Sequence, residues 1–468
     1  MSMRTEIPFF ESNGKSEITI SYSTKGSILI SIQKKTILVL IILGLLCVTI
    51  SFAEEIRPKD DLRVSWLKKH AIPLRSIDPN DEDYTDLEPL AKVLGNVRIV
   101  QLGEQSHGDG ATFHTKIRLI KFLHQRLGFD VLAFESGLYD CRKAWELLRG
   151  GMEPYEAFSH GVGIAWALSK QVTPLIEYWG KAAQSRQPLE LCGFDCLHLG
   201  KAYPDLLLKD VNDLWDNLGD AAPSTAQRSI ILNTLPKLDG SYKPRLQQRN
   251  QWHYALAAWR KALETTSPSD ALTEADLAFW RQYVDSTSTL AASRGWSLDK
   301  LELKQRKTLR DPQMARNLAW LTRTVYPKRK IIVWAASTHL LRNFRPSWSK
   351  DEVNVPVNMG HHVWREFGEE AYTIAFTTAE GEFGYVGLPK ARQLQPPAPD
   401  SLEDLFVRAG CINAFVDFRG LSSDGFWLKQ KLIARPLGYR NMEANWTDMF
   451  DGIVFTKKMF RSTMRDND

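Results

Sequence analysis

The sequence of 468 residues is poor in cysteine, which occurs only five times. Apart from Cys192 and Cys196, no Cys or His pair has the spacing of a zinc site. We interpret these two residues as buried free thiols, with a disulfide or metal ligation as the alternatives. The spacing of the cysteines therefore does not require a disulfide-stapled fold.

The sequence also lacks a strong charge of either sign, because 60 basic and 55 acidic residues leave a formal net charge of +5. Several basic residues lie near the N-terminus, and no basic stripe marks the rest of the chain. We therefore expect no nucleic-acid partner. With 43% hydrophobic and 25% charged residues, the composition is that of a globular protein that buries a full core.

A nucleophilic serine motif is a third absence. The sequence contains no Gly-x-Ser-x-Gly elbow, and the lone "HGVG" at 160–163 is too short to indicate an oxyanion loop. If the protein hydrolyses a substrate, water is therefore the expected nucleophile.

A long uncharged hydrophobic run covers residues 36–53, between two lysines and two glutamates. This pattern predicts that residues 1–56 are an export leader, either a signal peptide cleaved after Ala53 or an uncleaved anchor. We expect an exported protein, either periplasmic or secreted or anchored in the inner membrane. Only this segment is expected to contact a membrane.

Apolar runs of strand length alternate with helical patterns in residues 57–468, and runs that are apolar on both faces indicate a buried sheet. The sequence therefore predicts an α/β fold with a mostly parallel central sheet flanked by helices. From about residue 200 to 325, long amphipathic patterns predict a helical insertion. Trp252 and Trp259 recur there at a helical interval, which favours core packing over a ligand-stacking platform. The predicted strands are 97–104, 130–136, 189–195, 330–337, 372–378, 412–418 and 452–458.

Polar and ionisable side chains collect where these predicted strands end. Open parallel sheets bind ligands at the carboxyl ends of their strands, so we expect a site at this edge. The alternative is that the side chains merely cap the sheet. The residues at the strand ends are Glu104, His107, Glu135, Asp195, Ser337 and His339.

Glu104 and His107 have the residue types that proton transfer requires. A neutral imidazole takes a proton from water, and a carboxylate, Glu104 or Glu135, fixes its tautomer. Gly108 allows a sharp turn and the close approach of a substrate. Lys116 lies on the buried side of the next helix and either reaches back to the carboxylates or extends to solvent.

The segment "LGEQSHGDGATFHTKIRLIKFLHQRLGFDVLAFESG" resembles the N-terminal signature of the erythromycin esterase family. In that family a Gly-Glu-x-x-His-Gly segment is followed by a helix and by a strand that ends in Glu. The likeness continues through "LELCGFD", "RDPQMARNLAWL", "KIIVWAASTHL" and "NMGHHVWREFG" to "FDGIVF". It therefore spans most of the chain from about residue 95 onward.

The resemblance implies a metal-independent carboxylic ester hydrolase that opens a macrolide lactone with activated water and needs no cofactor. It places His107 at the general-base position and Glu104 and Glu135 at the supporting carboxylates. His339 matches the second His of the family's His-Asn-x-His segment. The expected partner is a small-molecule ester or lactone. Its expected binding residues are Lys116, Asp195, Ser337 and Arg310.

The chain departs from the family pattern at Ala336, where the antibiotic-hydrolysing members have the first His of that segment. Alanine carries no proton, so the contribution of that His is absent or comes from elsewhere. Two other classes therefore compete with an esterase. One is a non-catalytic protein linked to polysaccharide biosynthesis. The other is a metal-dependent hydrolase or peptidase whose divalent ion is held by Glu104, His107, Glu135 and His339.

Overall fold

The computed structural model describes residues 20–22, 28–30, 61–239, 242–299, 301, 303–343, 358–388 and 390–465. The chain divides into two units, residues 1–61 and 62–468. In the first unit, β1 (Ile20–Tyr22) pairs antiparallel with β2 (Ile28–Ile30).

The predicted hydrophobic run of the export leader, residues 36–53, lies outside the described residues. The leader and its cleavage therefore remain predictions. Within the described ranges, no helix combines the length and the apolar character needed to cross a membrane.

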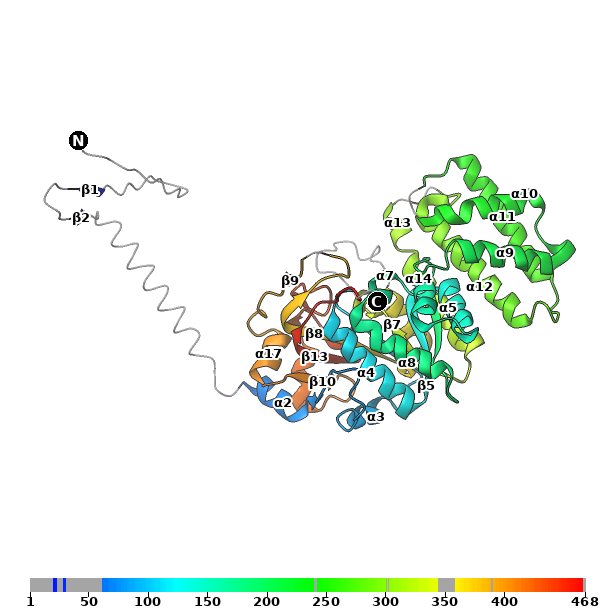
Figure 1. The fold of residues 1–468 in the computed structure, drawn as a ribbon. Coiled ribbons are helices and arrows are strands. Elements are labelled where there is room, and N and C mark those ends of the chain that lie inside the picture. The colour runs from blue at the N-terminus through cyan, green and yellow to red at the C-terminus, as the bar shows by residue number, and fades with distance from the viewer. Residues whose placement is uncertain are drawn as a thin grey trace. The chain divides into compact units, whose positions relative to one another are not determined.

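A nine-stranded sheet lies at the centre of the described part of the second unit (Figure 1). Its order is β3-β10-β13-β8-β4-β7-β5-β6, with β9 paired to β8. The strands from β13 to β6 run parallel, whereas β10 pairs antiparallel with both of its neighbours and β9 pairs antiparallel with β8. The predicted α/β fold with a mostly parallel sheet is confirmed. The strands are β3 (Ile72–Pro73), β4 (Ile99–Leu102), β5 (Phe129–Gly137), β6 (Glu190–Asp195), β7 (Lys330–Trp334), β8 (Ala371–Phe383), β9 (Arg392–Gln393), β10 (Asn413–Asp417) and β13 (Gly452–Met459).

The remaining regular structure of the second unit consists of α-helices, short 3-10 and π-helical turns, and one small hairpin. The hairpin pairs β11 (Leu432–Ala434) with β12 (Met442–Ala444). The described α-helices are α2 (Leu62–His70), α3 (Glu88–Leu94), α4 (Gly110–Leu127), α5 (Leu138–Arg149), α6 (Pro154–Gly161), α7 (Ile164–Ala167), α8 (Thr173–Ala183), α9 (Asp205–Leu218), α10 (Thr225–Thr234), α11 (Leu246–Thr265), α12 (Glu274–Ala291), α13 (Leu303–Lys307), α14 (Arg310–Trp320), α15 (Ser337–Leu340), α16 (Met359–Phe367) and α17 (Leu402–Arg408).

The strands are apolar on both faces because hydrophobic clusters cover both sides of the sheet, three clusters in the described residues. In β7, Ile331 and Val333 belong to the cluster that includes α9, α11, α12 and α14. Ile332 and Trp334 belong to the opposite cluster, which includes α3, α4 and α8. Alternation along one strand therefore assigns its side chains to two separate layers.

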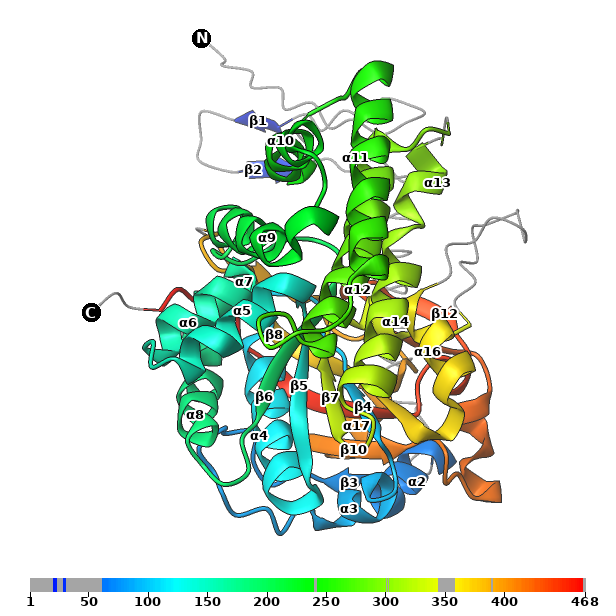
Figure 2. The same cartoon turned by 90° about the vertical axis from the view of Figure 1, so that its right-hand side faces the viewer.

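The segment from about 200 to 325 holds α9 to α14, and α9, α10 and α11 gather to one side of the sheet (Figures 1 and 2). Trp252 and Trp259 are both fully buried, which confirms their predicted packing role. The ring of Trp259 lies 5.6 Å from that of Trp215 in an edge-on contact. Cys192 and Cys196 are buried and free, as interpreted from the sequence.

Candidate active site

The candidate side chains lie at the carboxyl ends of four adjacent strands, β4, β7, β5 and β6. They form two groups, each built around a buried carboxylate. The first, which we name the Glu104 group, follows β4 and consists of Glu104, His107, Lys116 and Trp166. The second, which we name the Glu135 group, combines side chains from β5, β6, α14 and α15, namely Glu135, Asp195, Arg310, Asp311 and His339.

Three donors surround the fully buried carboxylate of Glu104. Its Oε1 accepts hydrogen bonds from His107 Nδ1 at 2.7 Å and from Trp166 Nε1 at 3.1 Å. Its Oε2 accepts from Lys116 Nζ at 2.8 Å. The ammonium of Lys116 also lies 3.9 Å from the centre of the Trp334 ring. The prediction that Lys116 reaches back to a carboxylate is confirmed.

Burial and charge act against each other in this group. Burial raises the pKa of Glu104, but the charge of Lys116 and the hydrogen bond from His107 more than offset it and hold the pKa below its usual value. Burial lowers the pKa of Lys116 to about 8, although Glu104 opposes the change. For His107, burial lowers the pKa, but Glu104 raises it more, so its pKa lies above the usual value.

The ring of His107 is arranged to accept a proton. Because Nδ1 lies so close to the Glu104 carboxylate, we assign the proton of the neutral ring to Nδ1. The other ring nitrogen, Nε2, then carries a free lone pair. No described residue hydrogen-bonds to Nε2, and the side chain is 30% exposed. The rings of Trp166 and Tyr385 lie 4.7 and 6.3 Å from the His107 ring. Glu104 is thus the carboxylate that orients this histidine.

The Glu135 group is held together by charge. Glu135 Oε1 lies 3.2 Å from His339 Nε2, and its Oε2 accepts from the backbone N–H of Ala336 at 2.8 Å. His339 Nδ1 lies 3.0 Å from both carboxylate oxygens of Asp311. Burial lowers the pKa of His339, but the two carboxylates raise it to about 10. The two carboxylates therefore favour the imidazolium form of His339, while Arg310 Nη1, a cation, also lies 3.3 Å from its Nε2.

Arg310 completes this group from the start of α14. Its guanidinium donates to Asp195, with Nη2 at 2.5 Å from Oδ2, and lies 3.2 Å from Glu135 Oε1. Asp195 is fully buried, so its charge holds Arg310 in place. The Arg310 side chain remains 27% exposed. A partly exposed cation thus stands beside Glu135.

The ligands considered for the metal-dependent alternative do not fit a divalent ion. The oxygens of Glu104 and Glu135 are already paired with Lys116 and Arg310, with ring and indole N–H groups, or with the backbone N–H of Ala336. Within the described ranges, no group of three or more His, Cys, Asp or Glu side chains is arranged to hold a metal.

Two predicted features have a packing function in the structure. The Ser337 side chain is fully buried, and a Cβ built on Gly103 would lie 2.5 Å from its Oγ. A Cβ on Gly108 would lie 2.5 Å from the backbone of Gly384. The close approach that Gly108 permits is thus to the protein's own chain, which corrects our expectation of a substrate there. Substrate binding by Ser337, Asp195 and Lys116 remains a prediction.

Sequence reasoning missed three side chains of the site. Asp311, which pairs with His339, directly follows Arg310, and that adjacency was a usable signal. Trp166 and Tyr385 lie far from the motifs in sequence, and nothing in their spacing marks them. Only the packing of α7 and of the turn after β8 brings them to His107.

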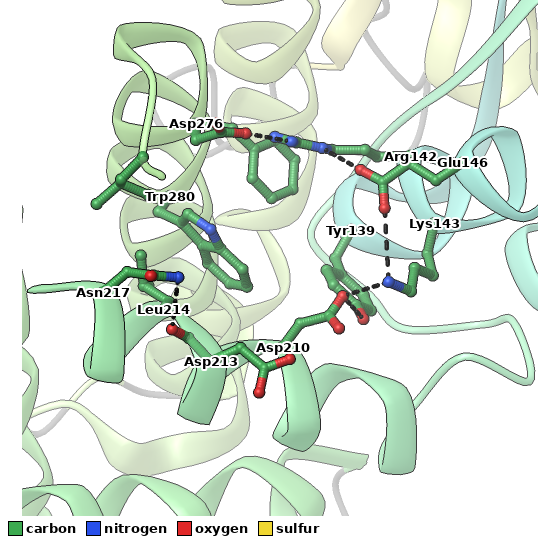
Figure 3. Close-up of a pocket in the computed structure, with 12 residues that line it drawn as sticks. Tyr139, Arg142, Lys143, Glu146, Asp210, Asp213, Leu214, Asn217, Asp276 and Trp280 are labelled. Carbon is green, nitrogen blue, oxygen red and sulfur yellow. Dashed lines mark hydrogen bonds and ion pairs between the residues drawn. The ribbon is translucent and has the colours of Figure 1, made fainter. Parts of the chain in front are cut away.

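A cavity of about 180 Å³ lies elsewhere, between α5, α9 and α12 (Figure 3). Its charged groups pair among themselves: Arg142 binds Asp276 at 2.7 Å, and Lys143 binds Asp210 at 2.6 Å. These contacts join α5 to the helices of the segment 200–325. The cavity therefore marks a junction between α5 and those helices.

The model of the erythromycin esterase family matches residues 124–459. The chain belongs to this family. The matched range contains Glu135, Asp195, Arg310 and His339, while the Glu104 group begins before it. The resemblance inferred from the sequence is confirmed.

Curated relatives extend the match along the chain. The Bacillus subtilis (strain 168) protein named "Putative hydrolase YbfO" is 27% identical over 424 residues, covering 85% of this chain and 91% of the relative. The Escherichia coli protein named erythromycin esterase type II is 24% identical over 434 residues, covering 84% and 97%. Family membership and these names support a hydrolase function.

Solved structures share the fold at low identity. A structure named as a succinoglycan biosynthesis protein has a TM-score of 0.70 at 18% identity, covering 87% of this chain and 100% of that chain. A Bacillus cereus protein has a TM-score of 0.69 at 17% identity, with coverage of 86% and 98%. A mutant of the erythromycin esterase EreC in its open conformation has a TM-score of 0.58 at 18% identity, with coverage of 84% and 98%.

Proposed function

We propose that this erythromycin esterase family member is a hydrolase in which His107 activates water for attack on a carboxylic ester or lactone. One observation carries the proposal: a fully buried carboxylate, Glu104, holds His107 Nδ1 at 2.7 Å and leaves Nε2 open on a partly exposed ring. This is the geometry of a general base whose tautomer is fixed.

The chemical steps follow from that geometry. Nε2 takes a proton from water while the water oxygen attacks the carbonyl carbon of the ester, and a tetrahedral oxyanion forms. Glu104 stabilises the resulting imidazolium of His107 through Nδ1. When the carbon–oxygen bond to the leaving group breaks, Nε2 returns the proton to the departing alkoxide. The products are a carboxylic acid and an alcohol, or a hydroxy acid from a lactone.

The Glu135 group contributes charge to the same reaction. Arg310 is 27% exposed, and the two carboxylate neighbours of His339 favour its imidazolium form, so both place positive charge beside the carboxylate of Glu135. In a partly desolvated site, fixed positive charge stabilises a developing oxyanion. We therefore assign substrate-carbonyl binding to Arg310 and a positioning function to His339.

A macrolide lactone is one candidate substrate, because a relative is named an erythromycin esterase. Ala336 replaces the imidazole that the resemblance leads us to expect, and its backbone N–H still binds Glu135. An exported location, with a function in antibiotic resistance, is part of the same proposal. Assembly of a polysaccharide without catalysis is the competing outcome.

Replacing the base tests the proposal. We expect the full-length protein to hydrolyse members of a panel of lactones and acyl esters, and the variant His107→Asn to lower kcat by about 10²- to 10⁴-fold. Asn retains a polar side chain of similar reach, and the site is partly exposed, so thermal stability is expected to change little. Turnover is measured by acid release at constant pH.

Two controls make the result interpretable. Dialysis against a chelator is expected to leave turnover unchanged, and its loss with recovery on adding a divalent ion would support the metal-dependent class. A folded His107→Asn variant with full turnover would remove His107 as the base. Tight ligand binding without turnover by the wild-type protein would favour the non-catalytic class.

A further inference from the structure

We propose that Trp166 is a positioning residue: its indole N–H fixes the Glu104 carboxylate and limits how strongly that carboxylate holds a proton on His107. The inference rests on the proposed function only in assigning His107 as the base. The family resemblance assigned no function to Trp166.

Trp166 and His107 share one oxygen of the Glu104 carboxylate as their hydrogen-bond acceptor. Trp166 is 3% exposed and lies on α7, a helix of four residues that follows α6. Its Nε1 donates to Glu104 Oε1 at 3.1 Å, the same oxygen that accepts from His107 Nδ1 at 2.7 Å. The indole and the imidazole thus compete for the electron density of one atom.

The rings of Trp166 and His107 also pack against each other. The centre of the Trp166 ring lies 4.7 Å from that of His107, with the planes at 68°. On another side, Trp166 contacts Phe134 of β5 at 5.3 Å, which anchors the indole to the sheet. The tryptophan therefore restrains both members of the Glu104–His107 pair.

Other buried tryptophans of the described chain provide a comparison. Six that are fully buried have an indole N–H without a hydrogen-bond partner: Trp179, Trp215, Trp252, Trp259, Trp296 and Trp334. Trp166 differs from these because its N–H ends on a carboxylate.

A neutral donor on a carboxylate disperses negative charge and makes it a weaker partner for a cation. Loss of the indole N–H should therefore leave Glu104 more basic and favour the imidazolium of His107. Other charged groups act on this pair from Lys116 and Asp109 at α4, Glu135 on β5 and His339 on α15. All of these groups are present in the wild-type protein and the variant alike, and Lys116 and Asp109, whose pKa values burial shifts to about 8, titrate in both.

The test compares Trp166→Phe with Trp179→Phe in the full-length protein. Both changes shrink a buried ring, but only the first removes a hydrogen bond to Glu104. The modification rate of His107 by diethyl pyrocarbonate is measured against pH by mass spectrometry of the labelled peptide. We expect the midpoint to rise by about 0.5 to 1 pH unit in Trp166→Phe and to stay at the wild-type value in Trp179→Phe.

The acid limb of kcat/KM should move in the same direction and by a similar amount. Equal midpoints in two folded variants would overturn the inference. A shifted midpoint in a protein that hydrolyses no ester would support the positioning by Trp166 while rejecting the proposed function, so the two failures are distinguishable.

A second measurement covers the case in which Trp166→Phe does not fold. In the wild-type protein, labelled with ¹⁵N-tryptophan, the indole N–H resonance of Trp166 should titrate together with His107. The indole of Trp179 should not follow that titration. A pH-independent Trp166 resonance across the His107 titration would also overturn the inference.

Discussion

His339 lies between two carboxylates, Asp311 and Glu135, whereas His107 contacts one, Glu104, which Lys116 already neutralises. The first setting holds a proton on the ring, and the second leaves a ring nitrogen open. Two side chains of the same type thus differ in how strongly they are held in the protonated form, because their neighbours differ.

The charge on His339 predicts how stability depends on pH. Its folded-state pKa is about 10, whereas an unfolded His titrates near 6.5. The contribution of His339 to the free energy of unfolding is fully present below about pH 6.5. It is lost as pH rises toward 10, because in this range only the folded state holds the proton. The loss is at most about 1.4 kcal/mol per pH unit.

This dependence is measurable by denaturant unfolding of the wild-type protein and His339→Asn at pH 6, 7.5 and 9. The difference in unfolding free energy between them should shrink as pH rises. A difference that is constant across this range would show that His339 is neutral in the folded protein.

The contact between the turn after β4 and the turn after β8 sets the shape of the site at the level of elements. The turn after β4 carries His107, and the turn after β8 carries Tyr385, whose ring lies 6.3 Å from that histidine. Gly108 allows the two backbones to meet, because its missing Cβ would lie 2.5 Å from Gly384.

A pair of alanine substitutions tests this contact. Gly108→Ala forces the two turns apart and is expected to cost about 1 to 3 kcal/mol of stability, as overpacking does, together with most of the turnover. Gly384→Ala is the matched control, because its Cβ would meet neighbours at no less than 3.6 Å. Both variants are compared by thermal unfolding and ester turnover. Equal behaviour would show that the contact has no effect on the site.

The strands and the residues at their ends were predictable, because Glu104, Glu135 and Asp195 each follow an apolar run of strand length. The order and the direction of the strands in the sheet could not be predicted. The pattern of β10 resembles that of the parallel strands of the sheet, although Phe415 pairs antiparallel with Val454. Direction depends on how the connections cross the sheet, and local periodicity carries no such information.

The contact partners of each predicted side chain were harder to predict from the sequence. The distance from Glu104 to Trp166 spans 62 positions, and that from Asp195 to Arg310 spans 115. Such pairs arise from packing between helices and strands, which residue types and spacing do not specify. The pKa of His339 depends on its contacts with Glu135 and Asp311, which also arise from packing, and was therefore not predictable either.

The second unit of the molecule is expected to fold without the first. The candidate site and the sheet lie within residues 62–468, and their hydrophobic clusters use residues from Val64 onward. A protein of residues 57–468 should therefore keep the melting temperature and the ester turnover of the full-length chain. Thermal unfolding and turnover of both proteins check this. An insoluble truncated protein would show that the first unit contributes to folding.

The place of β7 between β4 and β5 bears on how the chain is made. A ribosome delivers β4 and β5 first, yet the strand that joins them is translated about 200 residues later. Glu135 and Asp195 likewise emerge long before Arg310, their cation. Until then the nascent chain has an open gap in its sheet and two carboxylates without that partner. The period between the synthesis of β5 and that of β7 is thus the stage at which this chain has most need of a chaperone.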